Sequence, residues 1–355
     1  MFLSENTPLV AIDIGSHSIK MAQMRGSGGK FELLNFSLMP LKDDSIIDGV
    51  IRKHDEVVET LTKMIKLEKI DTRFAVASIA GEAVIIKKIR VAKMTMEELK
   101  ANIEKEAEQH IPFDIDDVSI DFQLLDKNGS AENEDPDTME ILLVAVQKDL
   151  VDSLSDVLYD AGLKPAIIDL DVFAMVNAFE LGVDLKAGGV VAVIDLGESY
   201  THLHIMQEGL TAYTRDIPLG GNSCTQKLMS KFDLPSKEAA KLKLGKIPAN
   251  IQEAEVVQII VDSSVKVIEE VQKAFEFFNN TADGKVDRAY ITGGGALIQG
   301  MESLFSHHLN VPVEILNPMR GVKVNKRRFD QNTIDTLGPI STVALGLAAR
   351  RFDYQ

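Results

Sequence analysis

Apolar runs separated by short polar turns open the chain and predict three consecutive strands. The runs cover residues 8–15, 18–26 and 30–41, and Gly- and Ser-rich turns divide them, as in an antiparallel meander. The first run ends in Asp13, and the chain then turns on Gly15. A buried strand that ends in an acid followed by small polar residues is either an ordinary hairpin or a phosphate-binding turn.

Helical and strand periods alternate through the next part of the chain. Apolar residues near helical spacing predict a helix over 57–69, and a strand-like run follows at 73–81. A capping-box pattern at Thr95 and Glu98 begins a predicted helix over 95–110. The elements expected next are an alternating strand at 117–126, an acidic loop at 127–139, a buried strand at 140–147 and a helix to about residue 161.

The opening pattern then occurs a second time. Residues 188–221 again predict three meandering strands, and the first of them ends in Asp195 before a turn on Gly197. In both VAIDIGSHSIKMAQMRG and VAVIDLGESYTHLHIMQEG the acid precedes a glycine by two positions. A pattern that occurs twice indicates duplicated lobes rather than a long tandem repeat. The elements expected after it are an amphipathic helix at 261–278, a strand, glycine turn and helix at 287–309, and a small-residue helix at 342–350.

Composition narrows the class of protein. With 355 residues, 45% of them hydrophobic, the chain can form two domains or one fold with two lobes. The net charge of −16 argues against nucleic acid as a partner, because phosphate contacts need clustered Lys and Arg, and it disfavours adsorption to an anionic membrane. No signal peptide and no membrane-spanning run is expected. Cys224 is the only cysteine, which predicts a free structural thiol in a reducing, cytoplasmic compartment.

The two acid–glycine turns are more informative together than apart. A single turn of this kind is as easily an ordinary hairpin. Facing lobes, however, would point both turns at one phosphate chain, whose oxygens would accept hydrogen bonds from the backbone N–H groups of the turns. Asp13 and Asp195 would then hold Mg²⁺ through its hydration shell.

The stretch TGGGA (292–296) is the third element that a plain core does not explain. Three consecutive glycines cost backbone entropy, so the turn needs either a positive φ or a ligand close to the backbone, and we favour the ligand. The P-loop pattern is absent and no GxGxxG follows the first strand, so the two commonest nucleotide-binding folds are not indicated. No cluster of His, Cys or carboxylates has zinc spacing, and we expect His307 and His308 to face solvent.

Four stretches resemble the motifs of the actin-like ATPase superfamily, in that superfamily's order. AIDIGSHSIK, VIDLGESYTH, ITGGGALIQG and ALGLAAR are similar to its phosphate-1, phosphate-2, adenosine and second connecting motifs. Within the superfamily, EAEQHIPFDIDDVSIDFQLL, TRDIPLGGNSCTQKL and LGLAARRFD resemble the PilM family of type IV pilus assembly proteins. The resemblance implies an α/β, two-lobed actin-like fold of duplicated ribonuclease-H-like domains, with an inserted α+β subdomain of the FtsA/PilM type.

The same resemblance implies a division of the chain. The expected parts are a first lobe at 1–82, 162–187 and 340–355, an inserted subdomain on the partner-binding side at 83–161, a second lobe at 188–221 and 285–339, and its helical upper subdomain at 222–284.

It also implies a site for ATP and Mg²⁺, with Asp13 and Asp195 at the metal. The other expected nucleotide-binding residues are Gly15, Ser16, Ser18 and Lys20 around the phosphates, Gly197 and Thr201 facing them, Gly220 and Gly221 at the cleft edge, Gly293, Gly294 and Gly295 at the adenosine, and Glu270 and Lys273 at the ribose and adenine. The family more often has Arg and Ser where this chain has Lys273 and Ala274.

Two residues are candidates for ordering the attacking water. His202 matches a histidine that helps to order water in actin, and Asp171 lies near the acid or glutamine of the first connecting motif. His202 is equally well explained as a strand residue at the lobe interface that shares its face with His204. Both interpretations stay open.

The implied function is a cytoplasmic, nucleotide-binding scaffold of type IV pilus assembly. Such a protein would bind the cytoplasmic N-terminal peptide of PilN beside the inserted subdomain. It would reach PilO through PilN, contact the pilus motor ATPases, and lie at the inner membrane through these protein partners. ATP that contacts both lobes would favour the closed arrangement and couple the nucleotide to assembly. We expect slow or negligible hydrolysis.

Three alternatives differ in their sequence requirements. A sugar or acetate kinase of the superfamily needs a carboxylate base, for which Asp171 or Glu198 is available, but neither lies in a sugar-kinase signature. An FtsA-like division protein ends in an amphipathic membrane helix, which we expect to be missing after the terminal RRFDYQ. The secretion protein GspL carries a transmembrane segment and degraded nucleotide motifs.

Overall fold

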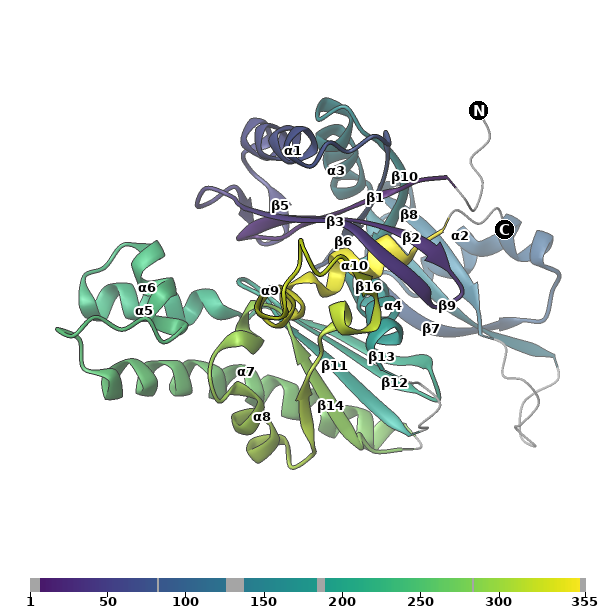
Figure 1. Ribbon diagram of the computed structural model, residues 1–355. Coiled ribbons are helices and arrows are strands. Elements are labelled where there is room, and N and C mark those ends of the chain that lie inside the picture. Colours follow the sequence, from purple (N-terminus) through teal and green to yellow (C-terminus); the bar gives the residue numbers. More distant parts are fainter. Residues whose placement is uncertain (1–6, 82, 126–136, 184–188, 283, 352–355) are drawn as a thin grey trace. The chain divides into compact units, whose positions relative to one another are not determined.

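The computed structural model describes residues 7–81, 83–125, 137–183, 189–282 and 284–351 (Figure 1). The chain forms two compact units, one of Met1–Ser78 with Val157–Gln355 and one of Ile79–Asp156. Within the loop expected at 127–139, residues 127–136 lie outside the described residues, and Thr138 already belongs to a strand.

The first sheet of the larger unit begins with the predicted meander, which is confirmed. Its strand order is β10-β6-β1-β2-β3-β16, with β1 antiparallel to β2 and parallel to β6. The register places Asp13 directly opposite Lys20. The strands are β1 Val10–Ile14, β2 Ser18–Ser27, β3 Lys30–Pro40, β6 Phe74–Ile79, β10 Lys164–Leu170 and β16 Lys323–Val324, and a separate small ribbon pairs β4 Ile46–Ile47 with β5 Val50–Ile51.

The second sheet repeats this topology, as the duplicated sequence pattern predicts. Its order is β13-β12-β11-β14-β15, and β11 is antiparallel to β12 and parallel to β14. Here Asp195 lies directly opposite His202, and His202 lies opposite Asp216. The strands are β11 Val190–Leu196, β12 Thr201–Gln207, β13 Leu210–Ile217, β14 Arg288–Thr292 and β15 Val313–Ile315.

Two apolar helices fill the space between the sheets. Helices α4 Asp171–Gly182 and α10 Thr342–Ala349 share one core with residues from both sheets. Because α10 is apolar on every side, it is stable only when it is surrounded by protein. Gly346 allows the helices to cross closely, since a Cβ there would overlap the carbonyl oxygen of Ala174.

Other helices cover the outer faces of the two sheets (Figure 1). Helix α1 His54–Glu68 packs against β2 and β3, burying Val57, Leu61 and Met64 at helical spacing. The second sheet is covered by α7 Glu253–Thr281 and α8 Met301–Leu309, and α5 Gly221–Phe232 and α6 Ser236–Lys243 form a smaller core with the first part of α7. Two further helices are α3 Lys148–Asp160 and α9 Gln331–Leu337. The sequence of α3 crosses the boundary between the two units.

The helix predicted to follow the glycine turn at 292–296 differs in detail from the observed one. The glycine turn after β14 leads first into a 3₁₀ turn at Gly294–Leu297, and α8 begins only at Met301. Gly300, with φ of +82°, separates the two, so the single helix expected there is divided.

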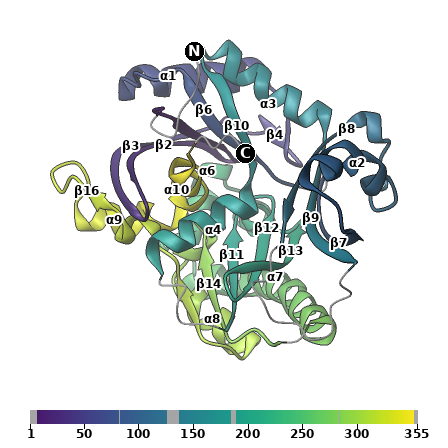
Figure 2. The same cartoon turned by 90° about the vertical axis from the view of Figure 1, so that its right-hand side faces the viewer.

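The smaller unit is a three-stranded antiparallel sheet with one helix on its apolar face (Figure 2). Its order is β7-β9-β8, formed by β7 Val84–Ala92, β8 Val118–Leu124 and β9 Thr138–Gln147. Helix α2 Met96–Glu108 begins at the predicted capping box, where Thr95 and Glu98 bond each other's backbone N–H groups. Its buried residues Leu99, Ile103 and Ala107 lie on the predicted face.

Candidate functional site

The first acid–glycine turn forms a tight, charged end to β1 and β2. Asp13 is 6% exposed, and its Oδ2 lies 3.1 Å from Lys20 Nζ. The Gly15 N–H donates to the Ser18 carbonyl over 3.1 Å, Ser18 is buried, and Ser16 lies in the turn itself. Burial raises the pKa of Asp13, and the charge of Lys20 opposes this. Burial lowers the pKa of Lys20, but the charges of Asp13 and Asp195 outweigh it, so that pKa is raised.

The second turn has the same form at the end of β11. The Gly197 N–H donates to the Tyr200 carbonyl over 3.0 Å, and Thr201 Oγ1 donates to the Leu219 carbonyl over 2.8 Å. Burial raises the pKa of Asp195, while His202 and Lys20 lower it. Because Lys20 belongs to the first sheet and Asp195 to the second, these shifts indicate that the two turns lie within electrostatic range of each other.

His202 on β12 forms a hydrogen bond with a residue on the neighbouring strand β13. Its Nδ1 lies 2.6 Å from Oδ1 of Asp216 on β13. Burial lowers the pKa of His202, but the hydrogen bond and charge of Asp216, with the charges of Asp171 and Asp195, outweigh burial and raise the pKa to about 9. At neutral pH the ring is therefore an imidazolium. His204, by contrast, is fully buried, and burial lowers its pKa to about 4, so it is neutral.

Asp171 joins this group as the first residue of α4. It accepts a hydrogen bond of 2.5 Å from Ser78 Oγ. Burial raises the pKa of Asp171, the charge of His202 and the Ser78 bond lower it, and the charge of Asp195 raises it further. The structure thus brings both predicted water-ordering residues, His202 and Asp171, into one electrostatic cluster with the two acid turns.

The charges of this cluster fit a divalent cation. It combines four carboxylates and two cations: Asp13, Asp171, Asp195 and Asp216 with Lys20 and His202. Its carboxylates outnumber its cations, and burial makes that excess of negative charge costly, in line with the raised pKa values of Asp13, Asp171 and Asp195. Mg²⁺ carries two charges and prefers oxygen ligands. Within the described part of the chain, no group of three or more His, Cys, Asp or Glu side chains is placed to hold a metal ion.

The three consecutive glycines of the TGGGA stretch have different surroundings. Gly293 has φ of +80°, and a Cβ there would overlap Asp195 Oδ1. A Cβ on Gly295 would lie 2.6 Å from Leu196 Cβ. These two glycines let the turn pack closely on the end of β11. Gly294 has nothing within 4 Å of its would-be Cβ, so it alone has open space in front of it.

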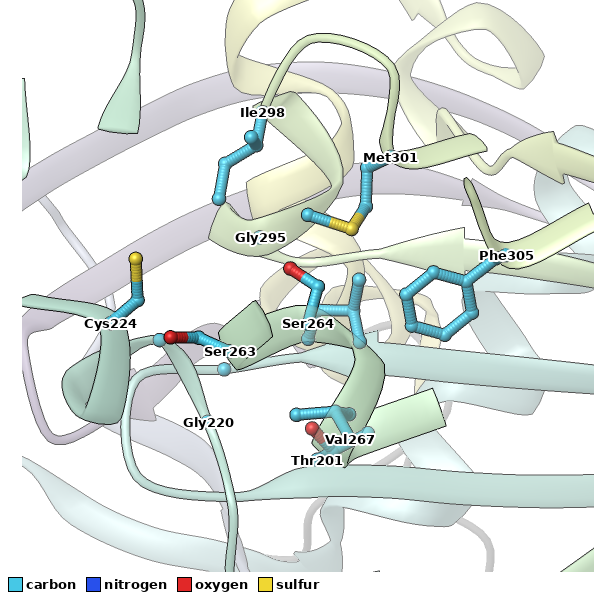
Figure 3. A pocket seen from close by; sticks show the side chains of 13 residues that line it. Thr201, Gly220, Cys224, Ser263, Ser264, Val267, Gly295, Ile298, Met301 and Phe305 are labelled. Atoms are coloured by element: carbon cyan, nitrogen blue, oxygen red, sulfur yellow. The ribbon is translucent and has the colours of Figure 1, made fainter. Parts of the chain in front are cut away.

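A cavity of about 40 Å³ lies beside this turn (Figure 3). Five of the predicted nucleotide-binding residues line it: Gly197, Thr201, Gly220, Gly221 and Gly295. The rest of its lining comes from β11, α5, α7 and the region around α8: Leu196, Cys224, Ser263, Ser264, Val267, Ile298, Met301 and Phe305.

The glycine pair that begins α5 closes against the second acid turn. The Gly221 N–H donates to the Gly197 carbonyl over 2.9 Å, and a Cβ on Gly220 would lie 2.5 Å from the Glu198 carbonyl oxygen. Lys243, at the end of α6, donates to the Gly221 carbonyl over 3.1 Å and lies 3.5 Å from a carboxylate oxygen of Glu198.

Glu270 and Lys273 lie on α7 but do not line this cavity. Lys273 Nζ lies 2.6 Å from Glu270, and Arg215 on β13 lies 2.8 Å from the other oxygen of that carboxylate. The hydrogen bond from Lys273, then the charges of Lys273 and Arg215, lower the pKa of Glu270. These contacts join α7 to the edge of the second sheet, and the predicted ribose and adenine contact stays a prediction.

Sequence reasoning missed three residues of the site. Asp216 is recognisable only once β12 and β13 are paired, because the register sets it opposite His202. Ser78 reaches Asp171 across 93 positions of sequence, and Lys243 reaches Gly221 across 22. The lone signal in the sequence was that Asp216 falls in a stretch already noted for its family likeness.

The duplicated sheets, with an acid turn at the end of each, define an actin-like ATPase fold. MreB5 of Spiroplasma citri bound to AMPPNP superposes with a TM-score of 0.53 at 13% identity, over 96% of this chain and 94% of that one. The ethanolamine utilization protein EutJ of Carboxydothermus hydrogenoformans gives a TM-score of 0.57 at 16% identity, over 96% and 88%. A chain of a PilM–PilN type IV pilus biogenesis complex gives 0.85 at 24% identity, over 97% and 98%.

A comparison of the sequence with protein-family models identifies the family. The model of the type IV pilus assembly protein PilM matches residues 11–352, so the chain belongs to the PilM family. The cell division protein FtsA of Borreliella burgdorferi is 25% identical over 171 residues, a match that covers 42% of this chain and about two fifths (41%) of that protein. Among the described residues, we find no helix with both the length and the apolar character to cross a bilayer.

Proposed function

We propose that this protein binds Mg²⁺-ATP in type IV pilus assembly and acts as a nucleotide-dependent scaffold. The observation that carries the proposal is the convergence of two acid–glycine turns, one from each sheet of the duplicated fold, on one buried charge cluster. A buried cluster in which carboxylates outnumber cations, beside a mostly apolar cavity, suits a nucleotide whose phosphates arrive with a divalent cation.

Each residue has a distinct part in this proposal. Asp13 and Asp195 hold the hydrated Mg²⁺ that bridges to the phosphates. The backbone N–H groups of the turns around Gly15 and Gly197 bind phosphate oxygens, and Lys20 adds a positive charge beside them. The cavity beside Gly295 receives the base.

Hydrolysis is expected to be slow. His202 is charged at neutral pH, so it donates hydrogen bonds and does not accept a proton from water. Asp171 is the remaining candidate proton acceptor, and burial raises its pKa. One of its carboxylate oxygens, however, already accepts a hydrogen bond from Ser78 Oγ. We propose that binding, rather than rapid turnover, is the function, with a rate below about 1 s⁻¹, the low end of typical enzymes.

The partner proposal rests on family membership. A relative of the same fold is described in a PilM–PilN complex, so we propose that this chain binds the cytoplasmic N-terminal peptide of PilN. Contact with PilO through PilN, with the pilus motor ATPases, and thereby with the inner membrane, follows as a proposal. A nucleotide that touches both lobes, divided as predicted from the sequence, favours their closed arrangement and couples ATP to partner affinity.

Calorimetry on the full chain tests both parts. Asp13→Ala/Asp195→Ala should weaken Mg²⁺-ATP binding by about 100-fold, the upper end for lost support of a bound metal. Asp55→Ala/Glu59→Ala, which removes two exposed carboxylates of α1, should leave it unchanged. Unaltered binding by the first variant would refute the nucleotide site. Equal affinity for the PilN peptide with and without Mg²⁺-ATP would refute the coupling.

A further inference from the structure

A second cavity, of about 430 Å³, lies at the opposite end of β1 from the charge cluster. Leu9, which immediately precedes β1, lines this cavity, whereas Asp13 near the other end of the strand belongs to the cluster. The four-residue step between them along an extended strand is about 13 Å. The cavity has no residue in common with the cavity beside the glycine turn. It is therefore a separate site within the larger unit.

A β-bulge between β2 and β3 shapes this second cavity. Gln23 pairs with Asn35, but the next pair joins Met24 to Leu33. Leu34 is therefore an extra residue on β3. Bulges re-aim side chains and are frequent beside functional sites. Here the bulge places the polar Gln23–Asn35 pair beside the apolar side chains of Met24 and Leu34, and all four residues line the cavity.

The hydrogen bonds of the Gln23–Asn35 pair fix the orientation of both amides. Arg328 Nη1 lies 2.7 Å from Asn35 Oδ1, and because a guanidinium only donates, its partner must be the amide oxygen. Asn35 Nδ2 then donates to Gln23 Oε1 over 3.0 Å. Gln23 is only 6% exposed, yet its Nε2 has no partner within the described chain. Its two N–H groups are left for a molecule in the cavity.

Cations outnumber carboxylates in the lining, although the whole chain has a net charge of −16. The charged lining residues are Arg25, Lys69, Asp71 and Arg351. Among the described residues Lys69 has no hydrogen bond or ion pair, and Arg351 bonds only backbone carbonyls. Burial lowers the pKa of Arg351, as it does for a guanidinium without an opposing carboxylate. Arg25 shares the carboxylate of Glu32 with Lys323, so that one charge faces two cations.

From these groups we propose that the second cavity binds an organic phosphate monoester. A phosphate has three acceptor oxygens and up to two negative charges, which suit the free N–H groups of Lys69 and Gln23 and the excess of cations. A carboxylate offers only two oxygens and one charge. The volume is that of a small-molecule site rather than of a bare ion, so the organic part lies against Leu9, Met24 and Leu34.

Calorimetry on the full chain at constant ionic strength tests the chemistry of the ligand. The probes are phenyl phosphate, inorganic phosphate and benzoate. Phenyl phosphate should bind about 10-fold more tightly than benzoate, which has the same ring, because it accepts at least one more charged hydrogen bond. It should also bind more tightly than inorganic phosphate, because its ring buries apolar lining.

Two variants with matched controls test the location. Gln23→Glu keeps an oxygen for Asn35 but replaces the free donor with a carboxylate oxygen, so it should weaken phenyl phosphate binding by about 10-fold or more. Lys69→Gln should weaken it by about 3-fold, as expected for the loss of an exposed charge. The controls Gln226→Glu and Lys66→Gln change exposed residues outside the lining and should leave the affinity unaltered. Because Lys69 is exposed, its variant remains informative even if Gln23→Glu does not fold.

Phenyl phosphate that does not bind the wild type, or that binds no more tightly than benzoate, would overturn the inference. Unchanged affinity in both Gln23→Glu and Lys69→Gln would also overturn it. Asp13→Ala/Asp195→Ala should still bind phenyl phosphate while losing Mg²⁺-ATP. Loss of both ligands in that variant would mean that the phosphate occupies the proposed nucleotide site, whereas loss of Mg²⁺-ATP alone supports two separate sites.

Discussion

Lys20 and His202 occupy equivalent positions in the two sheets. Each lies on the second strand of its meander, directly opposite the acid of the first strand, Asp13 or Asp195. They differ in what they bind. Lys20 lies 3.1 Å from Asp13 itself, whereas His202 lies 2.6 Å from Asp216 on the third strand. Each acid therefore has a cation on the neighbouring strand. In the second sheet an additional carboxylate, that of Asp216, binds that cation.

The charge on His202 should make stability depend on pH. Its pKa is raised from 6.5 to about 9, so its contribution is fully present below pH 6.5 and is lost as the pH rises through 9. From the size of this shift, the wild type should lose about 3 kcal/mol more than His202→Gln between pH 6.5 and 9.5. Urea unfolding at both pH values measures this. Parallel pH profiles for the two proteins would mean that His202 is not charged in the native state.

Removing the charge of Asp195 should stabilise the protein while weakening its site. Burial raises the pKa of Asp195, so the folded state disfavours its ionised form at neutral pH. Asp195→Asn should increase the free energy of unfolding by about 1 kcal/mol without ligand, as active-site replacements often do. The same variant should bind Mg²⁺-ATP more weakly. Asp262→Asn, an exposed carboxylate on α7, is the control, and a loss of stability in Asp195→Asn would contradict the prediction.

Alanine should destabilise the protein at Gly293 but not at the adjacent Gly294 of the TGGGA turn. Gly293→Ala places a Cβ against Asp195 at a positive φ, so it should lower the free energy of unfolding by about 2 kcal/mol or more. Gly294→Ala meets nothing within 4 Å and should leave stability within about 0.5 kcal/mol. If Gly294 faces the nucleotide, its alanine variant should still bind ATP more weakly. Chemical denaturation and calorimetry on the pair check both statements.

An ion pair between a partly exposed arginine and a buried carboxylate joins the end of α10 to β10. Arg350 bonds both carboxylate oxygens of Asp169, over 2.6 Å and 3.0 Å, and the Asp169 side chain is 6% exposed. Arg350→Ala removes two charged hydrogen bonds and leaves the buried carboxylate with the Leu170 N–H as a donor, which should cost about 2 kcal/mol. Arg350→Ala/Asp169→Asn should be more stable than Arg350→Ala alone, because the orphaned charge is gone. Equal stability of the single and double variants in urea would argue that the pair is not formed.

The local elements and the candidate acids could be predicted from the sequence. Hydrophobic alternation places the strands, the Thr95–Glu98 pair begins α2, and the repeated acid–glycine turn indicates duplication. These are short-range features, since side-chain periodicity and capping depend on residues a few positions apart. Asp13 and Asp195 were identifiable from the repeated turn, whereas Asp171 and His202 were named only from the resemblance to the actin-like superfamily.

Contacts between distant segments were decided only by the tertiary structure. Strand register selects Asp216 as the partner of His202, and the meeting of β6 with α4 brings Ser78 to Asp171. Packing between α7 and β13 also gives the Glu270 carboxylate two partners, Lys273 and Arg215, of which the sequence indicated only Lys273. A sequence specifies which groups are available within one element. Which groups face each other, and so which charges and protons remain for a ligand, depends on packing between elements that sequence spacing does not encode.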